Sequence, residues 1–526
     1  METLRSYFFL VWAISGIQSA HATPADTSDQ RKPHIIVIMA DDMGYSDLGC
    51  YGGEAFTPNL DRLARGGLRF RTFYNAARCC PSRAALLTGV YPHEAGMGEM
   101  VSEVNSVPDP GPYQGYLSDR TVTIAEALKP AGYISYLSGK WHVGEKPEHW
   151  PRRRGFDRYF GLISGASSYF ELVDEPRVRQ MVHDDEPWMP PEDGFYMTDA
   201  FSDTAVAFVE QHMRTAKEAP FFLYLAYTAP HWPLHAPEAD VKRYKGMFDD
   251  GWDEVRKRRF ERMRALGVID DDHHLSPRPA DIPPWESVDN PANWARRMEV
   301  YTAMIDRMDQ GIGKLLSALE RLGELDNTLI FFLSDNGGCD ENIDGRELNQ
   351  LGSEIGKRGS YIAYDKPWAN VSNTPYRQYK SWTHEGGMIT PFIAHWPAGI
   401  KRHGQSTETV GHIVDLMATC LDVAGLQYPE RFNEKLMVPL RGESLMPAFE
   451  REKAKSRTLY WEHFGKKAVR SGDWKLVSGG KEQPWELYNL IEDPVELNDI
   501  AAQHPEIVEQ LRHMYAAWAD GAGVKK

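Results

Sequence analysis

Four short apolar runs, each ending in charged or metal-capable side chains, constrain the fold of this 526-residue chain most strongly. They are residues 34–40, 133–137, 221–226 and 328–333. Apolar runs this short are typical of buried parallel strands. Helical patterns lie between them. We therefore expect an α/β fold with a large mixed, mostly parallel sheet sandwiched by helices.

Local signals mark the helices between these strands. Thr57 and Pro58 open a helix that Gly66 and Gly67 close. Thr123 and Glu126 form a capping box for a helix that ends near residue 132. A longer helix that ends at Gly323 is predicted by apolar residues at helical spacing: Met298, Tyr301, Met304, Ile305, Met308, Ile312, Leu315 and Leu319.

The polar residues that follow the four strands are candidates for one site. In open α/β sheets, ligands bind beyond the carboxyl ends of the strands. We therefore expect a single crevice lined by residues from all four strand ends, namely Asp41, Asp42, Lys140, His142, His231, Asp335 and Asn336.

The domain organisation follows from changes in composition along the chain. Residues 1–22 read as a signal peptide, although a buried N-terminal helix is the alternative, and residues 23–33 read as a linker. Residues 34–452 form the predicted catalytic α/β domain. Residues 453–526 form a small α+β domain with an antiparallel sheet and a terminal helix. The Pro- and Trp-rich stretches 170–200 and 240–295 read as long insertions.

Net charge and cysteine content narrow the class of protein. The formal charge of −16 disfavours nucleic acid as a partner, and an anionic substrate would need a local cationic pocket. The signal peptide predicts export to the periplasm or the extracellular space, and no later stretch looks transmembrane. Five cysteines at irregular spacing do not form a disulfide framework: Cys50, Cys79, Cys80, Cys339 and Cys420.

Hard oxygen ligands at two strand ends predict a divalent cation. Adjacent aspartates in an apolar setting repel each other unless a cation is present, as at Asp41-Asp42. Together with Asp335 and Asn336 they form an all-oxygen set, which suits calcium or magnesium better than zinc. For Asp335-Asn336-Gly337-Gly338 alone, an ordinary turn is the alternative.

Cys79 lies just before a predicted helix, with Pro81 at the first helical position. Free N–H groups and the helix dipole make such a position a ready anion site. Taken alone, Cys79 is better interpreted as a small hydrophobic residue packed at the start of a helix.

The segment from Cys79 to Gly89 resembles the signature of the type I, formylglycine-dependent sulfatases. The matching residues are Cys79, Pro81, Ser82, Arg83, Leu87, Thr88 and Gly89. The resemblance covers essentially the whole mature chain and is greatest to the soluble bacterial arylsulfatases of the alkaline-phosphatase superfamily. It includes Asp41-Asp42, residues 139–142 and 230–233, residues 335–337, and Lys380 before Glu385. The motif selects Cys79 rather than Cys80, because the modified residue stands two before the proline.

The resemblance implies a sulfuric ester hydrolase that cleaves aryl, alkyl or carbohydrate sulfates to alcohol and sulfate. A formylglycine-generating enzyme would convert Cys79 to formylglycine (3-oxoalanine). Calcium, with magnesium as the alternative, would be bound by Asp41, Asp42, Asp335, Asn336 and the modified Cys79. The substrate would be a small sulfate ester or a sulfated glycan.

The resemblance also implies a role for each remaining site residue. Formylglycine hydrates to a diol, one hydroxyl of which attacks sulfur, with Asp335 as the base. His231 is the candidate acid, and Lys380 lies beside the bridging oxygen. His142 takes the proton from the second hydroxyl, which expels sulfate, while Arg83 and Lys140 hold the diol and sulfate oxygens.

Other functions remain open at this point. A phosphonate monoesterase or phosphodiesterase of the same superfamily would have nearly the same site. An unmodified secreted sulfoglycan-binding protein would follow if Cys79 stayed a thiol. A cysteine hydrolase would need a histidine near Cys79 but gives no role to the paired aspartates.

Overall fold

Strand β1 (His34–Ala40) is apolar after its first residue because both of its faces are buried. Ile36 and Ile38 lie in the core layer of helices α4 (Met197–Thr215) and α7 (Pro291–Leu322). Ile35 and Val37 lie in the opposite layer, with helices α2 (Cys79–Thr88) and α10 (Asp415–Ala424). The continuous apolar run is therefore two alternating faces, each covered by helices.

The structure is a computed structural model that describes residues 31–101, 111–173, 178–450 and 456–525. From Lys32 onwards the described residues form one compact unit. The predicted signal peptide and most of the predicted linker lie outside the described residues. None of the helices in the described ranges has the length and apolar character needed to cross a bilayer.

The main sheet has ten strands in the order β11-β2-β10-β9-β1-β8-β4-β5-β6-β7. The five central strands from β9 to β5 run parallel, and the pairs β10–β9, β10–β2, β5–β6 and β6–β7 are antiparallel. This confirms the expected mixed sheet. Besides β1, its strands are β2 (Leu68–Phe70), β4 (Ile134–Gly139), β5 (Arg158–Leu162), β6 (Met181–His183), β7 (Glu186–Trp188), β8 (Phe221–Ala226), β9 (Thr328–Ser334), β10 (Phe392–His395) and β11 (Gln405–Thr407).

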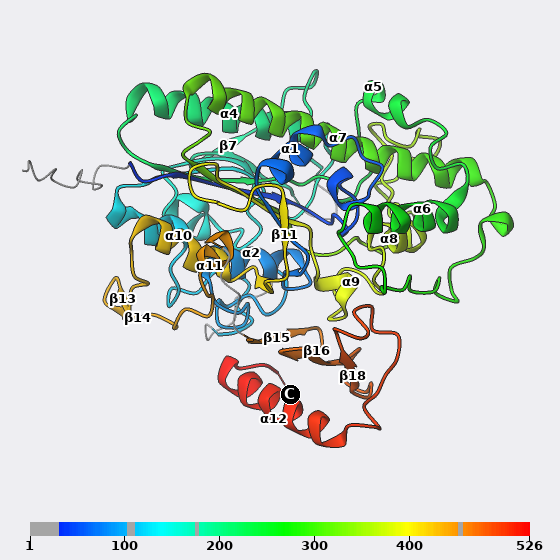
Figure 1. Cartoon of the computed structure of the whole chain (residues 1–526). Coiled ribbons are helices and arrows are strands. Elements are labelled where there is room, and N and C mark those ends of the chain that lie inside the picture. The colour runs from blue at the N-terminus through cyan, green and yellow to red at the C-terminus, as the bar shows by residue number, and fades with distance from the viewer. Residues whose placement is uncertain (1–30, 102–110, 174–177, 451–455, 526) are drawn as a thin grey trace, which may run out of the picture. The chain divides into compact units, whose positions relative to one another are not determined.

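Helices cover both faces of the sheet, as Figure 1 shows for α1, α4 and α7 on one side and α2, α10 and α11 on the other. The remaining helices are short or lie at the periphery. Besides those already given, the helices are α1 (Pro58–Gly66), α3 (Ile124–Leu128), α5 (Glu238–Val241), α6 (Gly251–Ala265), α8 (Asp365–Ser372), α9 (Glu385–Met388), α11 (Met446–Glu450) and α12 (Pro505–Ala522).

The predicted helix signals are largely present. Thr123 and Glu126 form the capping box of α3, and Gly323 ends α7 in the left-handed conformation, with φ of 74°. Thr57 precedes α1, but its hydroxyl does not cap the helix. That hydroxyl donates to the carboxylate of Asp61 and accepts from the backbone of Gly49 instead.

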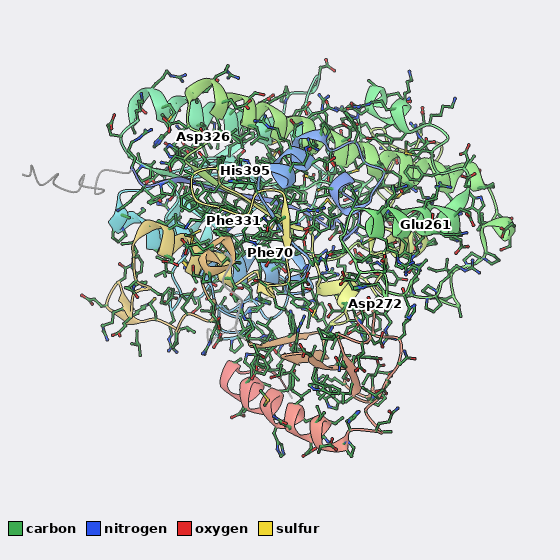
Figure 2. The ribbon with its side chains drawn as sticks, viewed as in Figure 1. Phe70, Glu261, Asp272, Asp326, Phe331 and His395 are labelled. Atoms are coloured by element: carbon green, nitrogen blue, oxygen red, sulfur yellow. The ribbon has the colours of Figure 1, made fainter. Side chains whose placement is uncertain are left out.

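The two predicted insertions carry secondary structure of their own. Strands β6 and β7 arise from the first and extend the main sheet at its edge. Helix α6 arises from the second, and its Arg259 is buried against Asp47 and Glu54. In Figure 2, Glu261 and Asp272 mark the exposed side of this region, whereas Phe70 and Phe331 lie inside the sheet.

The C-terminal segment forms a four-stranded antiparallel sheet in the order β15-β16-β17-β18, as expected. Its strands are β15 (Thr458–His463), β16 (Lys466–Ser471), β17 (Trp474–Ser478) and β18 (Glu486–Asn489). One face packs on α12 through Val469, Leu476 and Leu487. The alternate residues Ala468 and Val477 join the main core. The proposed boundary at residue 453 lies outside the described residues, so the division into two domains stays a prediction.

Smaller two-stranded sheets complete the architecture. Strand β3 (Phe73–Tyr74) pairs in parallel with β12 (Gly411–His412). Strand β13 (Arg431–Phe432) pairs antiparallel with β14 (Lys435–Leu436). The β3–β12 pair lies just before the segment that leads into Cys79, so it helps to fix the start of α2.

Substitution of Lys475 by methionine should strongly destabilise the fold. Its Nζ lies 2.7 Å from Glu385 Oε1 and 2.7 Å from Glu496 Oε1, and all three side chains are buried. Without the lysine, two carboxylates stay buried without their cation, which should cost about 3–5 kcal/mol in the free energy of unfolding. Urea unfolding measures this cost. The partly exposed Lys467 of the same sheet is the control, and a loss for Lys475→Met no larger than for Lys467→Met would contradict the prediction.

Candidate active site

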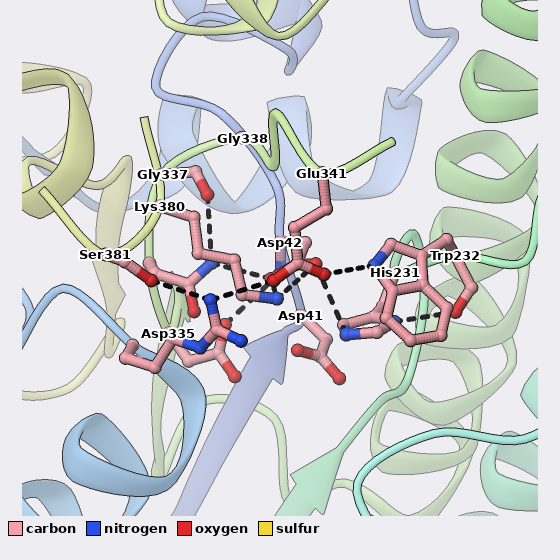
Figure 3. Close-up of polar contacts among 12 residues, drawn as sticks. Asp41, Asp42, His231, Trp232, Asp335, Gly337, Gly338, Glu341, Lys380 and Ser381 are labelled. Carbon is pink, nitrogen blue, oxygen red and sulfur yellow. Dashed lines mark hydrogen bonds and ion pairs between the residues drawn. The ribbon is translucent and has the colours of Figure 1, made fainter. Parts of the chain in front are cut away.

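The carboxyl ends of four neighbouring parallel strands bring the predicted site residues together. Strands β9, β1, β8 and β4 are adjacent in the sheet, so their carboxyl ends share one edge. Figure 3 shows Asp41, Asp42, Asp335, His231 and Lys380 converging there. Only Lys380 of this group comes from a long loop, between α8 and α9.

Asp42 is the centre of the hydrogen-bond network. It is buried and has a left-handed backbone, with φ of 65°. Its Oδ1 lies 2.7 Å from Lys380 Nζ and accepts a hydrogen bond of 2.7 Å from Asn336 Nδ2. His231 Nε2 lies 3.4 Å from Oδ2. Burial raises the pKa of Asp42, but His231 and Lys380 more than offset this and hold it below its usual value. The carboxylate therefore stays ionised.

Asp41 and Asp335 share the cationic side chains of Lys140 and Arg83. Lys140 Nζ lies 2.5 Å from Asp41 Oδ2. Arg83 donates from Nε and Nη2 to Asp335 Oδ2, at 3.1 and 2.9 Å, and its Nη2 lies 3.6 Å from Asp41 Oδ2. Burial is the largest cause that raises the pKa of both aspartates. Both carboxyl groups are thus destabilised as anions despite their cationic neighbours.

Two buried oxygen atoms at this strand edge are unpaired. Asp41 Oδ1 and Asn336 Oδ1 receive no hydrogen bond from any residue in the described ranges. Buried acceptors are rarely left unpaired, and a hard divalent cation binds such oxygens well. Ligand atoms of Asp41, Asp42 and His231 lie within 4.8 Å of one another. The residues present therefore fit a divalent cation.

Cys79 is the first residue of α2, so the expectation that Pro81 would take the first helical position is wrong. Pro81 takes the third helical position instead, where its missing N–H breaks no helical hydrogen bond; the first such bond runs from Ser82 N–H to Arg78 O at 2.9 Å. The Cys79 thiol is buried at this helix start. A hydrogen bond from Cys80 is the largest cause that lowers the pKa of the thiol well below its usual value, and the charge of Lys140 adds to this effect against burial.

His142 packs beside the two cysteines. Cys80 Sγ lies 3.3 Å from His142 Nε2, and the ligand atoms of Cys79, Cys80 and His142 lie within 4.8 Å of one another. Burial lowers the pKa of His142 to about 3, so the ring is neutral and can accept a proton. The ring fits because residue 165 is glycine: a Cβ there would lie 2.4 Å from His142 Cε1.

His231 lies on the opposite side of the cluster, next to Lys380. Its Nδ1 is 2.6 Å from the carbonyl oxygen of Trp232, so Nδ1 carries a proton and Nε2 faces Asp42. Burial lowers the pKa of His231 to about 3, while Asp42 acts to raise it. An anion next to Nε2 would add to the effect of Asp42 and favour the protonated ring.

Arg78, Glu341 and Ser381 also join the site, although the sequence did not identify them. Arg78 Nη1 donates to Ser381 Oγ at 2.6 Å and lies 2.9 Å from Glu341 Oε1. Trp232 Nε1 donates to Glu341 Oε2 at 2.9 Å, and Figure 3 shows Glu341 between Trp232 and Lys380. Arg78 could have been found from its place directly before Cys79. No pattern marks Glu341, which lies in the irregular loop after β9.

A family model described as Sulfatase matches residues 33–426 of this chain, which is most of its length. The chain belongs to the sulfatase family. A second model, described as N-sulphoglucosamine sulphohydrolase, C-terminal, matches residues 377–518. The sulfatase therefore extends through the C-terminal sheet, and the family confirms the resemblance that the Cys79 motif carries.

Known sulfatases align with the chain over most of its length. The arylsulfatase of Klebsiella aerogenes is 36% identical over 80% of this chain and 93% of its own. The human N-acetylgalactosamine-6-sulfatase is 30% identical over 76% of this chain and 63% of its own. The solved structure of Ps i-CgsB in complex with k-i-k-neocarrahexaose has a TM-score of 0.68 and 29% identity, and the alignment covers 93% of each chain. Membership of this family makes the protein a sulfuric ester hydrolase.

Removal of divalent cations from this sulfatase should lower its melting temperature. Without a cation, the carboxylates of Asp41, Asp42 and Asp335 repel one another in a buried setting. A cation at a hundredfold excess over its Kd should add about 3 kcal/mol to stability, which corresponds to a few degrees. Thermal unfolding after chelation, with calcium or magnesium added back, measures the shift. The shift should largely disappear in Asp41→Asn, and equal melting temperatures with and without cations would contradict the prediction.

Proposed function

We propose that this sulfatase is an exported, calcium-dependent enzyme that removes sulfate from saccharides through a formylglycine made from Cys79. The observation that carries the proposal is the position of Cys79 at the start of α2. There its side chain interacts electrostatically with Lys140 and His142, next to the aspartate cluster. Residues 1–22 carry a signal-peptide pattern, which supports export to the periplasm or the extracellular space.

Two of the relatives support the proposal that the substrates are sulfated saccharides. The human relative is named for N-acetylgalactosamine 6-sulfate, and Ps i-CgsB was solved with a neocarrahexaose. The arylsulfatase of Klebsiella aerogenes supports activity on small aryl sulfates as well. We therefore propose a carbohydrate sulfate as the natural substrate and an aryl sulfate as a usable laboratory substrate.

The roles of the cationic residues follow from charge balance. The buried carboxylates of Asp41, Asp42 and Asp335 face the cationic groups of Arg83, Lys140 and Lys380, so the formal charges cancel without a metal. A divalent cation bound by Asp41, Asp42, Asp335 and Asn336 would leave a surplus of two positive charges. That surplus matches a deprotonated nucleophile and a sulfate monoester, and when bound the cation would also polarise the attacking oxygen.

The proposed aldehyde explains why an unmodified cysteine would not suffice as the nucleophile, since a thiol has no second hydroxyl to release the sulfate. The aldehyde at position 79, when hydrated, supplies one hydroxyl to attack sulfur and a second to expel sulfate from the enzyme. Arg83 and Lys140 lie beside Asp335 and Asp41, and we propose that they orient the reacting oxygens. Asp335, whose carboxylate has a raised pKa, is our candidate for the base that deprotonates the attacking hydroxyl.

The two histidines would act in different steps, His231 when the alcohol departs and His142 when sulfate is released. His231 and Lys380 both contact Asp42, and we propose that His231 protonates the departing alcohol while Lys380 stabilises the bridging oxygen. His142 lies beside Cys79 and Cys80 and is neutral, so it is our candidate for the base that accepts the second hydroxyl proton. A formylglycine-generating enzyme is the partner that maturation requires.

Cys79→Ala should abolish sulfatase turnover while the fold is retained, because only Cys79 supplies the nucleophile. Mass spectrometry of the tryptic peptide from Cys79 to Arg83, from protein made in its natural host, should show the aldehyde at position 79 and an intact thiol at Cys80. Cys80→Ser is the matched control: it should still be converted at position 79. Two intact thiols in active enzyme, or residual turnover by Cys79→Ala, would rule out this nucleophile.

Asp42→Ala should lose bound metal and activity together, because Asp42 is the hub that contacts Lys380, His231 and Asn336. Elemental analysis of purified protein measures calcium and magnesium directly. Glu341→Gln removes a nearby carboxylate charge that we do not assign to the metal, so it should keep its metal content. Unchanged metal in Asp42→Ala would exclude Asp42 from the ligand set.

A further inference from the structure

Three basic side chains from two distant parts of the chain gather beside Cys79. Arg78 directly precedes it, His463 ends β15 and Lys466 starts β16. The segment after Lys380 connects them. Ser381 donates from its backbone to Ala77 O at 2.7 Å and accepts from Arg78. The Trp382 ring lies 4.9 Å from Lys466 Nζ. Arg78 and Lys466 therefore flank one short segment next to the catalytic lysine.

The hairpin that carries His463 and Lys466 is held in place by the main body. Thr383 Oγ1 donates to the backbone oxygen of Lys467 at 3.2 Å. Trp461, two residues before His463, donates from its indole nitrogen to Asn75 O at 2.8 Å. The hairpin thus contacts both the segment before Cys79 and the segment after Lys380, and these contacts hold it at one side of the site.

The ammonium group of Lys466 lies in this cluster without a directly paired carboxylate from the described part of the chain. Burial is the largest cause that lowers the pKa of His463, to about 3, so the His463 ring is neutral. Burial also lowers the pKa of Lys466, against the attraction of Asp340, and the charge of Arg78 adds to both effects. Arg78 pairs with Glu341, but within the described ranges neither His463 nor Lys466 has a carboxylate within 4 Å. The ammonium group of Lys466 and the guanidinium group of Arg78 create a local attraction for an anion, to which the neutral His463 ring can donate an N–H.

Several hydrogen-bonding atoms of the cluster are also unsatisfied. The His463 side chain is buried, and neither of its ring nitrogens has a partner in the described part of the chain. Arg78 Nε is likewise buried and unpaired. Such groups are rare in folded proteins unless a ligand or water completes them. A sulfate or carboxylate group offers several acceptor oxygens of the required charge.

We propose that Arg78, His463 and Lys466 form a second anion subsite, which binds a further sulfate or carboxylate of the saccharide whose scissile sulfate lies at Cys79. This rests on the proposed function and narrows it: the preferred substrate carries at least two anionic groups. A small aryl sulfate has only one and leaves the subsite empty. Lys466 is then a specificity-determining residue contributed by the C-terminal sheet.

The test is a comparison of binding constants on the Cys79→Ala enzyme with calcium present, so that turnover does not interfere. The probes are pairs of uronate–hexosamine disaccharides that carry the same sulfates, with and without one additional sulfate. Calorimetry should show that the additional anion lowers Kd by about tenfold, the size of one charge-assisted contact. Lys466→Gln should remove this gain, whereas Lys466→Arg should retain it.

Lys467→Gln is the matched control, because residue 467 lies on the opposite face of β16 and should leave the gain intact. Higher salt should reduce the gain. The inference is overturned if no disaccharide binds, if the additional anion does not lower Kd, or if Lys466→Gln keeps the gain. The proposed function fails separately: wild-type enzyme with Cys79 converted would then not hydrolyse 4-nitrophenyl sulfate or any of the disaccharides.

Discussion

The buried pairing of Asp42 with Lys380, His231 and Asn336 is the interaction on which the site depends. It joins the end of β1 to the end of β8, the end of β9 and a loop that approaches from outside the sheet. Each partner alone would be costly to bury, and together they offset one another's desolvation. The three parallel strands and the loop must all be in place before this carboxylate is stabilised.

The same reasoning explains why the helices on both faces matter for chemistry. Ile35 and Ile36 of β1 anchor opposite layers, so the strand cannot shift without disturbing both cores. A sheet clamped in this way holds side chains at its edge to the precision that catalysis requires. The residues at this edge are therefore held by both core layers, and our proposal assigns substrate preference to a peripheral residue, Lys466.

The sequence predicted the parts of the structure in which local pattern and tertiary context agree. The apolar run at β1 could be identified because a buried strand has a distinctive composition. The polar residues that follow it could be identified because packing alone does not explain them. The start of α2 was predicted two residues too late, because a proline fits any position of the first turn, where the N–H groups make no helical bond. Glu341, His463 and Lys466 could not be predicted, because their importance lies in distant contacts that no spacing rule records.

Cys79 is only 2% exposed in the folded protein, at the first turn of a buried helix. Under the proposed function, a separate enzyme must enclose the residue that it oxidises, and this thiol offers it almost no accessible surface in the folded protein. The proposal therefore requires that Cys79 be converted before α2 folds into the core. A sequence that folded faster around α2 would then leave less time for conversion of Cys79 and yield a smaller fraction of active catalyst.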